Sequence, residues 1–292
     1  MSNQLEACKK TRKVAIDALY KTLKFTLESK ELVSEALFRD KWLENLRKSK
    51  NIYSDGWYIP PPSGMAVLFG PPIKGGRTYY EHLRVEKMWP RDDIYLTKEN
   101  SIIYVYCSPV DKNTGVIGDI GLSIYLGKNP KVKNHLKKCL ELNKKISDFI
   151  EVGKTVSEVN KYAFKVMEEM GLSNDVVAIH DPSGSNIGHS VPIPNKLWAK
   201  NEKETLISKK IKWEIKKDII SKKRIYFNAI EQTKFSKNTA MTIEPRLTST
   251  KEKDIPLTSF HTILLIDKNG KKEFLLSYDK IFKLAGMDYL LK

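Results

Sequence analysis

Five ionisable residues interrupt apolar runs of this 292-residue chain, and their types are those that bind metal ions or transfer protons. They are Asp119 in "VIGDIGLSIYLG", His180 in "VVAIHDPSG", His189 in "NIGHSVPIP", Glu244 in "MTIEP" and His261 in "SFHTILLI". Burying an unpaired carboxylate costs several kcal/mol or forces it to take up a proton. Aspartate, glutamate and histidine on separate strands are ligands that proteins use for Mn, Fe, Co or Zn. We therefore expect a metal site where these strands share a sheet.

Each of the five residues also has a structural explanation when taken alone. Asp119 and His180 fit turns, and His189 and His261 fit core histidines whose hydrogen bonds are satisfied. Glu244 fits an exposed residue at a strand edge. Only the combination of one aspartate, one or two histidines and one glutamate favours the metal site.

The elements that must position these residues follow from the hydrophobic pattern. Residues 6–47 show helical periodicity twice, which predicts a helical hairpin, and residues 131–170 predict a second pair of helices. In the second pair, Thr155 and Glu158 form a capping box after Gly153, a helix terminator. The predicted strands are 64–69, two runs around a turn in 101–127, and the segments "RIYFNAI", "TAMTIEPRL", "TSFHTILLID" and "KEFLLS".

The two helix pairs contain a short internal sequence repeat. The segment "LESKELVSE" at 27–35 matches "IEVGKTVSE" at 150–158, and strands follow each copy. We expect one α+β domain over 1–292, with similar halves at about 1–128 and 129–292 facing a shared antiparallel sheet layer. A Lys-rich insertion is expected at about 196–226. Antiparallel strands without βαβ crossovers disfavour a dinucleotide-binding fold.

Four of these segments together resemble the methionine aminopeptidase, aminopeptidase P and creatinase superfamily (M24), over about residues 10–280. They are "IEVGKTVSEVNKYAFKVMEEMG", "GDIGLSIYLG", "IGHSVPIP" and "MTIEPRL", of which "MTIEP" is the most specific. The resemblance implies a pita-bread fold with two pseudo-symmetric halves. It also implies a site for two metal ions on five ligands.

Carried over residue by residue, the resemblance makes Asp119, His180 and Glu244 metal ligands. It places His189 beside the substrate, where it assists catalysis, and His261 is the second candidate catalytic residue. The spacing of nine residues between His180 and His189 leaves open that His189 is itself the ligand.

The chain departs from the family pattern at two ligand positions. The first aspartate is expected where Cys107 and Ser108 stand, and the last glutamate where Phe260 stands. Asp111 is a candidate replacement for the missing aspartate, although a turn explains it better. The remaining trio predicts one divalent ion (Mn, Fe, Co or Zn) rather than two, and a site without any ion remains an alternative.

The expected function is a metal-dependent hydrolase that cleaves an N-terminal residue from a peptide, or a related small amide. The main alternative is a pita-bread protein that lost its chemistry and binds protein or nucleic acid. A nucleophilic Cys107 is disfavoured, because a buried thiol in an apolar strand is usually inert.

The composition bounds these functions. The chain is 41% hydrophobic, which is typical of a globular protein. Its net charge of +16 comes mostly from dispersed Lys, which disfavours a nucleic-acid partner without excluding it. No run is long enough for a membrane span or signal peptide, and the three cysteines are too scattered for disulfides or a thiolate zinc site. We expect a soluble cytoplasmic protein, and a homodimer remains open.

Overall fold

The computed structural model describes residues 3–54, 56, 61–79, 85–175, 181, 183, 185–191, 199–208, 212, 215, 218, 219, 222 and 224–291. The helices are α1 (Asn3–Glu28), α2 (Glu35–Arg47), α3 (Pro130–Phe149), α4 (Val156–Met170), α5 (Lys200–Ile207) and α7 (Asp279–Leu284). The strands are β1 (Ile52–Tyr53), β2 (Met65–Gly70), β3 (Ile102–Cys107), β4 (Val110–Asp111), β5 (Ile120–Tyr125), β6 (Leu172–Asn174), β7 (Gly188–Val191), β8 (Thr239–Ile243), β9 (Arg246–Ser249), β10 (Thr258–Ser259), β11 (Thr262–Ile266) and β12 (Lys272–Leu275). Short 3₁₀ turns occupy Pro62–Gly64, Glu86–Met88 and Asp288–Leu290.

Two antiparallel sheets form the centre of the molecule. One has the strand order β2-β3-β5, and the other has the order β12-β11-β8-β7. An isolated bridge between Leu122 of β5 and Phe260 connects the two sheets. The first half of β5 and the residues just before β11 are therefore neighbours, although more than a hundred residues separate them in the sequence.

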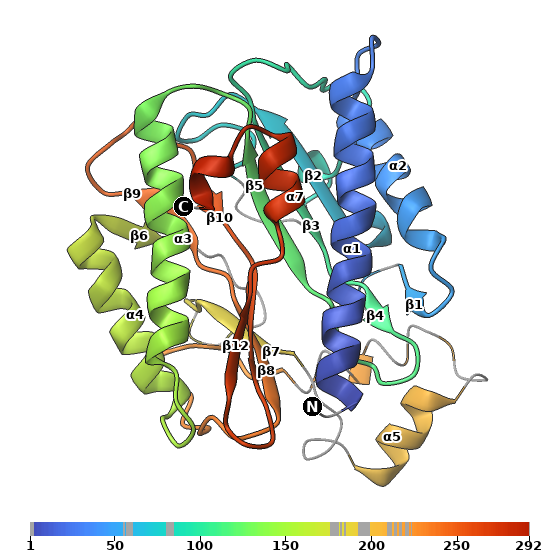
Figure 1. The fold of residues 1–292 in the computed structure, drawn as a ribbon, viewed down its shortest axis with the longest axis vertical. Helices are drawn as coiled ribbons and strands as arrows, with labels where there is room; N and C mark the ends of the chain where they lie inside the picture. Colours follow the sequence, from blue (N-terminus) through green and yellow to red (C-terminus); the bar gives the residue numbers. More distant parts are fainter. Residues whose placement is uncertain are drawn as a thin grey trace.

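Helices cover one side of these sheets. In Figure 1, α3 lies on the left and α1 on the right in front of the strands, and α7 lies between them. The apolar sides of both helices enter one large hydrophobic core, which includes Leu19 and Leu23 of α1 and Leu136 and Ile146 of α3. The same order of a helix pair followed by strands occurs twice along the chain, as the internal sequence repeat predicts.

Both predicted helix pairs are confirmed. The second helix of each pair is capped at its N-terminus in a different way. Helix α4 has the predicted capping box, in which Thr155 and Glu158 bond each other's backbone N–H groups, and it ends at Gly171 in a left-handed conformation. Helix α2 instead begins after Ser34, whose side chain accepts a hydrogen bond from the backbone N–H of Leu37.

The predicted strand "RIYFNAI" is only partly right. The backbone N–H of Ser190 in β7 donates to Ile225 (2.8 Å), and that of Phe227 donates to Gly188 (2.9 Å), so this segment does lie along β7. Pairing then stops, because the Asn228 side chain accepts hydrogen bonds from two following backbone N–H groups and turns the chain. Within the described part of the Lys-rich insertion, α5 is a regular helix.

Candidate metal centre

Neighbouring strands of one sheet bring three of the predicted site residues together. His189 lies in β7, Glu244 follows β8, and His261 precedes β11. The register aligns Gly188 and Thr262 with the same residue of β8, Ile243. The three side chains are therefore placed at one end of adjacent strands.

Asp119 reaches this group from the other sheet. It stands directly before β5, and the backbone N–H of His261 donates to the carbonyl of Gly121 at 2.7 Å. This hydrogen bond joins the two sheets beside the carboxylate. The predicted convergence of Asp119, His189, Glu244 and His261 is thus present in the structure.

Asp119, His189 and Glu244 form a group that fits a metal ion. One ligand atom from each lies within 4.8 Å of the others. His189 Nε2 is 3.6 Å from Glu244 Oε1 and 3.7 Å from Asp119 Oδ2. Among the described residues, Oδ1 of the fully buried Asp119 has no hydrogen-bond partner, which is costly for a carboxylate oxygen in the protein interior. The donor set, one imidazole and two carboxylates, suits Zn, Mn, Fe or Co.

His261 contacts the same two carboxylates from the opposite side. Its Nδ1 lies 2.8 Å from Glu244 Oε2 and 3.2 Å from Asp119 Oδ2. The Tyr104 hydroxyl lies 3.5 Å from Nε2, and the Tyr106 ring packs at 5.5 Å between centroids. The imidazole is fully buried among these groups.

The two histidines differ in their electrostatics. Burial lowers the pKa of His189 and outweighs the nearby Glu244 carboxylate, so this imidazole is neutral and can ligate a metal. Burial also opposes charge on His261, but the Glu244 carboxylate, with Asp119, outweighs it and raises the pKa of His261 to about 10. For Glu244 burial would raise the pKa, yet His261 and His189 hold it well below its usual range.

Two residues that the sequence analysis missed donate hydrogen bonds to the backbone of the site. Arg12 of α1 is fully buried and donates to the backbone carbonyls of Asp119 and His261. The Tyr278 hydroxyl donates to the carbonyls of Gly121 (3.1 Å) and His261 (2.8 Å). The sequence offered no signal for Arg12, which stands in a Lys-rich helix that predicts solvent exposure.

Phe260 and Cys107, which stand where the resemblance expects carboxylate ligands, are both buried. The Phe260 ring is buried against Phe282, with centroids 6.0 Å apart, and offers no ligand. Burial, with a smaller contribution from Asp119, raises the pKa of the Cys107 thiol well above its usual value. A cysteine nucleophile is therefore disfavoured, because the thiolate is the reactive form.

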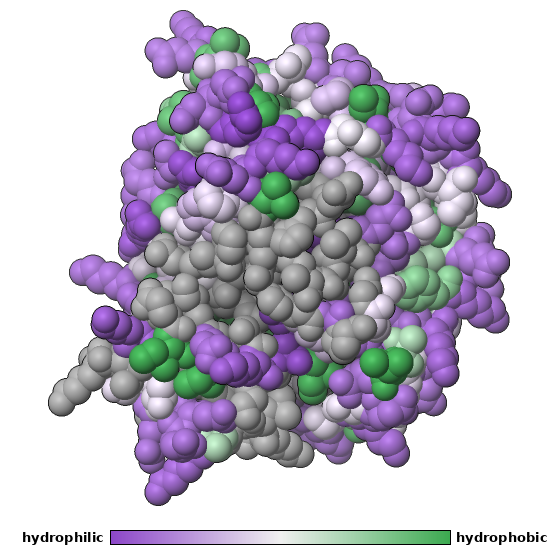
Figure 2. Space-filling view, turned by 180° about the vertical axis from the view of Figure 1, so that it is seen from behind, coloured by the Kyte–Doolittle hydropathy of each residue, from purple (hydrophilic) through white to green (hydrophobic). Residues whose placement is uncertain are grey.

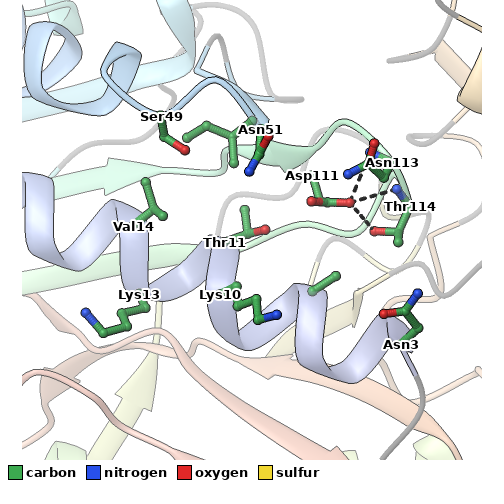
Figure 3. A pocket seen from close by; sticks show the side chains of 12 residues that line it. Asn3, Lys10, Thr11, Lys13, Val14, Ser49, Asn51, Asp111, Asn113 and Thr114 are labelled. Carbon is green, nitrogen blue, oxygen red and sulfur yellow. Dashed lines mark hydrogen bonds between the residues drawn. The ribbon is translucent and has the colours of Figure 1, made fainter.

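Asp111 is a turn residue. Its Oδ1 accepts hydrogen bonds from the backbone N–H groups of Asn113 and Thr114 and from the Thr114 hydroxyl (Figure 3). It lines a cavity of about 450 Å³ between α1, residues 49–52 and the 111–114 turn, and none of the metal-site residues lines this cavity. Predicted ligand His180 lies outside the described residues.

Comparisons with known proteins identify a family. The family model described as "Metallopeptidase family M24" matches residues 84–265, well over half of the chain. No curated protein matches the sequence.

Several solved structures share the fold. An X-Pro aminopeptidase from Thermotoga maritima is 12% identical, with a TM-score of 0.60 over 94% of this chain and 61% of its own. A prolidase from Pyrococcus horikoshii is 14% identical, with a TM-score of 0.60 over 95% and 62%. A methionine aminopeptidase from Thermotoga maritima is 16% identical, with a TM-score of 0.55 over 92% and 96%. The chain thus spans about three fifths of the length of the first two proteins and nearly all of the third.

Proposed function

Because the chain belongs to metallopeptidase family M24, we propose that it is a metal-dependent hydrolase of peptides or related amides with one divalent ion held by Asp119, His189 and Glu244. The observation that carries this proposal is that one ligand atom from each of Asp119, His189 and Glu244 lies within 4.8 Å of the others. His189 is here the imidazole ligand, the alternative that the sequence left open. The ligand role of His180 stays a prediction.

A divalent ion in such a site supplies a Lewis acid that polarises a carbonyl and makes water more acidic. The chain's own residues have separate roles. Neutral His189 provides a donor that needs no deprotonation at neutral pH, and Asp119 provides a fully buried carboxylate. Glu244, with 14% of its side chain exposed, is the member of the trio that a substrate can approach.

Two of the metal ligands that the resemblance implies are replaced by other residues. This replacement supports a slow hydrolysis or a narrow range of substrates. Phe260 stands where the resemblance expects a glutamate that also helps to move a proton, and Ser108 or Cys107 stands where it expects an aspartate. The peptide substrate follows from the names of similar structures, an X-Pro aminopeptidase and a methionine aminopeptidase. Their identities are too low to carry over the cleaved bond.

The test is release of the first residue from peptides beginning with Met or with Xaa-Pro, followed by mass spectrometry. The protein is stripped with chelator and reloaded with Co, Mn, Zn or Fe, beside a Glu244→Ala variant. We expect metal-dependent release by the wild type and a loss of at least tenfold in the variant. Equal release by both proteins, or none with any metal, would contradict the proposal.

The second candidate is a binding protein without catalysis, and His261 is the observation that favours it. Its Nδ1 lies within 3.2 Å of both carboxylates, so the protein itself supplies a partner that offsets their burial. The net charge of +16 would then favour an acidic partner. Absence of metal binding together with unchanged stability in chelator would favour this candidate.

A further inference from the structure

A single nitrogen of His261 serves both carboxylates of the site. Nδ1 lies 2.8 Å from Glu244 Oε2 and 3.2 Å from Asp119 Oδ2, so its N–H is shared between one oxygen of each group. The other two oxygens are differently placed. Glu244 Oε1 lies 3.6 Å from His189 Nε2, and Asp119 Oδ1 has no hydrogen-bond partner.

Asp119 Oδ2 also lies 3.7 Å from His189 Nε2, so His261 holds both carboxylates against the remaining histidine. One ligand atom from each of Asp119, His189 and Glu244 lies within 4.8 Å of the others, and this group suits one ion.

The backbone of His261 is fixed by three other parts of the chain. Its N–H donates to Gly121 of β5 (2.7 Å), and its carbonyl accepts from Arg12 Nη2 of α1 (2.7 Å) and from the Tyr278 hydroxyl (2.8 Å). Gly121 is required here for space, because a Cβ at this residue would lie 2.2 Å from the His261 ring. Little freedom remains for the imidazole to move away from the carboxylates.

We propose that His261 is a positioning residue, whose Nδ1 holds the carboxylates of Asp119 and Glu244 beside His189 so that these three side chains bind a single divalent ion. The inference rests on the proposed function, and it assigns to His261 the orientation of the ligands rather than contact with substrate. Groups that hydrogen-bond to metal ligands typically change metal affinity by about 10–100-fold when they are removed.

The test is titration calorimetry of the chelator-stripped full chain with Co²⁺, comparing wild type with His261→Ala and His261→Asn. We expect one ion per wild-type chain, and a Kd about 10–100-fold higher for His261→Ala. The asparagine amide can place an N–H near the position of Nδ1, so His261→Asn should recover most of the affinity. Such a rescue would not follow from a merely structural role.

Two further variants distinguish a loss of ligand positioning from a general loss of folding. Gly121→Ala keeps the imidazole and all three ligands but displaces the ring, and it should weaken Co²⁺ binding in the same direction. His135→Ala removes a buried histidine of α3, which is no member of the metal group, and should leave the Kd for Co²⁺ unchanged. Thermal unfolding of each variant shows whether the chain is folded at the temperature of the titration.

Three results would overturn the inference. An unchanged or tighter Kd in His261→Ala would mean that the imidazole does not position the ligands. Equal weakening in His261→Asn and His261→Ala would mean that the N–H donor is not the cause. Absence of Co²⁺ binding by the wild type would instead remove the proposed function itself, and the inference with it.

Discussion

At the scale of single residues, Glu244 shows how a carboxylate is tolerated at the end of an apolar strand. It lies between two imidazoles, with His261 Nδ1 at 2.8 Å and His189 Nε2 at 3.6 Å. The spacing of "MTIEP" and the histidine positions predicted a shared site. They could not predict which histidine would face which oxygen, because that depends on strand register and on Arg12 and Tyr278.

His135 gives a pH prediction at the same scale. Burial lowers its pKa to about 4 from the usual 6.5. Between these two values the unfolded chain binds a proton that folded His135 does not, so the free energy of unfolding falls as pH falls through this window. By the same linkage, the loss from pH 7 to pH 5 is about 2 kcal/mol.

Urea denaturation at pH 7 and pH 5 tests this contribution. In His135→Gln, which cannot titrate, the loss of unfolding free energy between the two pH values should shrink by about 2 kcal/mol. The other histidines stay in both proteins, so the difference isolates His135. An identical pH dependence in wild type and variant would contradict the prediction.

At the scale of elements, Arg12 connects α1 to both sheets. It donates to the backbone carbonyls of Asp119, His261 and Leu276, and its guanidinium lies 4.9 Å from the Tyr278 ring centroid. Its partners stand more than a hundred residues away in the sequence. No local pattern distinguishes Arg12 from the exposed lysines beside it, which is why the sequence analysis missed it.

Arg12→Met should lower the free energy of unfolding by about 3 kcal/mol or more, because buried carbonyls lose charge-assisted hydrogen bonds. The matched control is Lys13→Met on the exposed side of the same helix, where only a surface pair with Asp17 is lost. That change should cost less than about 1 kcal/mol. Similar urea midpoints for the two variants would contradict the structural role of Arg12.

Glu35 shows a second limit of the sequence analysis. The internal sequence repeat aligns Glu35 with Glu158, whose side chain caps α4. Glu35, however, is fully buried at the start of α2. Its carboxylate accepts from the backbone N–H groups of Phe69 (2.7 Å) and Arg91 (3.1 Å), and from both Nε and Nη2 of Arg77 (2.7 and 2.8 Å). The same amino acid at equivalent positions of the two repeated segments therefore has different structural roles.

Glu35→Gln should lower the free energy of unfolding by about 3 kcal/mol, because it leaves the Arg77 guanidinium mostly buried without its counter-charge. Glu44→Gln, in an exposed pair with Lys41, serves as the control and should change the free energy of unfolding much less, because solvent screens an exposed pair. Guanidinium salt would screen these pairs, so urea denaturation is the appropriate measurement. A Glu35 effect as small as that of Glu44 would show that the pair is unimportant.

At the scale of the whole molecule, the predicted pita-bread fold is confirmed. Helical periodicity, the repeated "VSE" segments and four motif-like stretches sufficed for this, because they recur in the same order as the elements. The boundaries of the halves at 128 and 129, the single domain and the homodimer stay predictions. None of the described helices is long and apolar enough to cross a membrane.

Figure 2 shows the hydropathy of one face of the molecule. The face opposite to that of Figure 1 is mostly hydrophilic where its residues are described, with small hydrophobic areas between (Figure 2).

The most direct test of the proposed function is the metal content of the purified chain after loading with Co, Mn, Zn or Fe and removal of excess ions, measured by mass spectrometry. We predict close to one tightly bound ion per wild-type chain, and loss of that ion in Glu244→Ala, with Glu44→Ala as a control that keeps it. Wild-type protein without metal, or equal metal in Glu244→Ala, would contradict a metal centre at Asp119, His189 and Glu244.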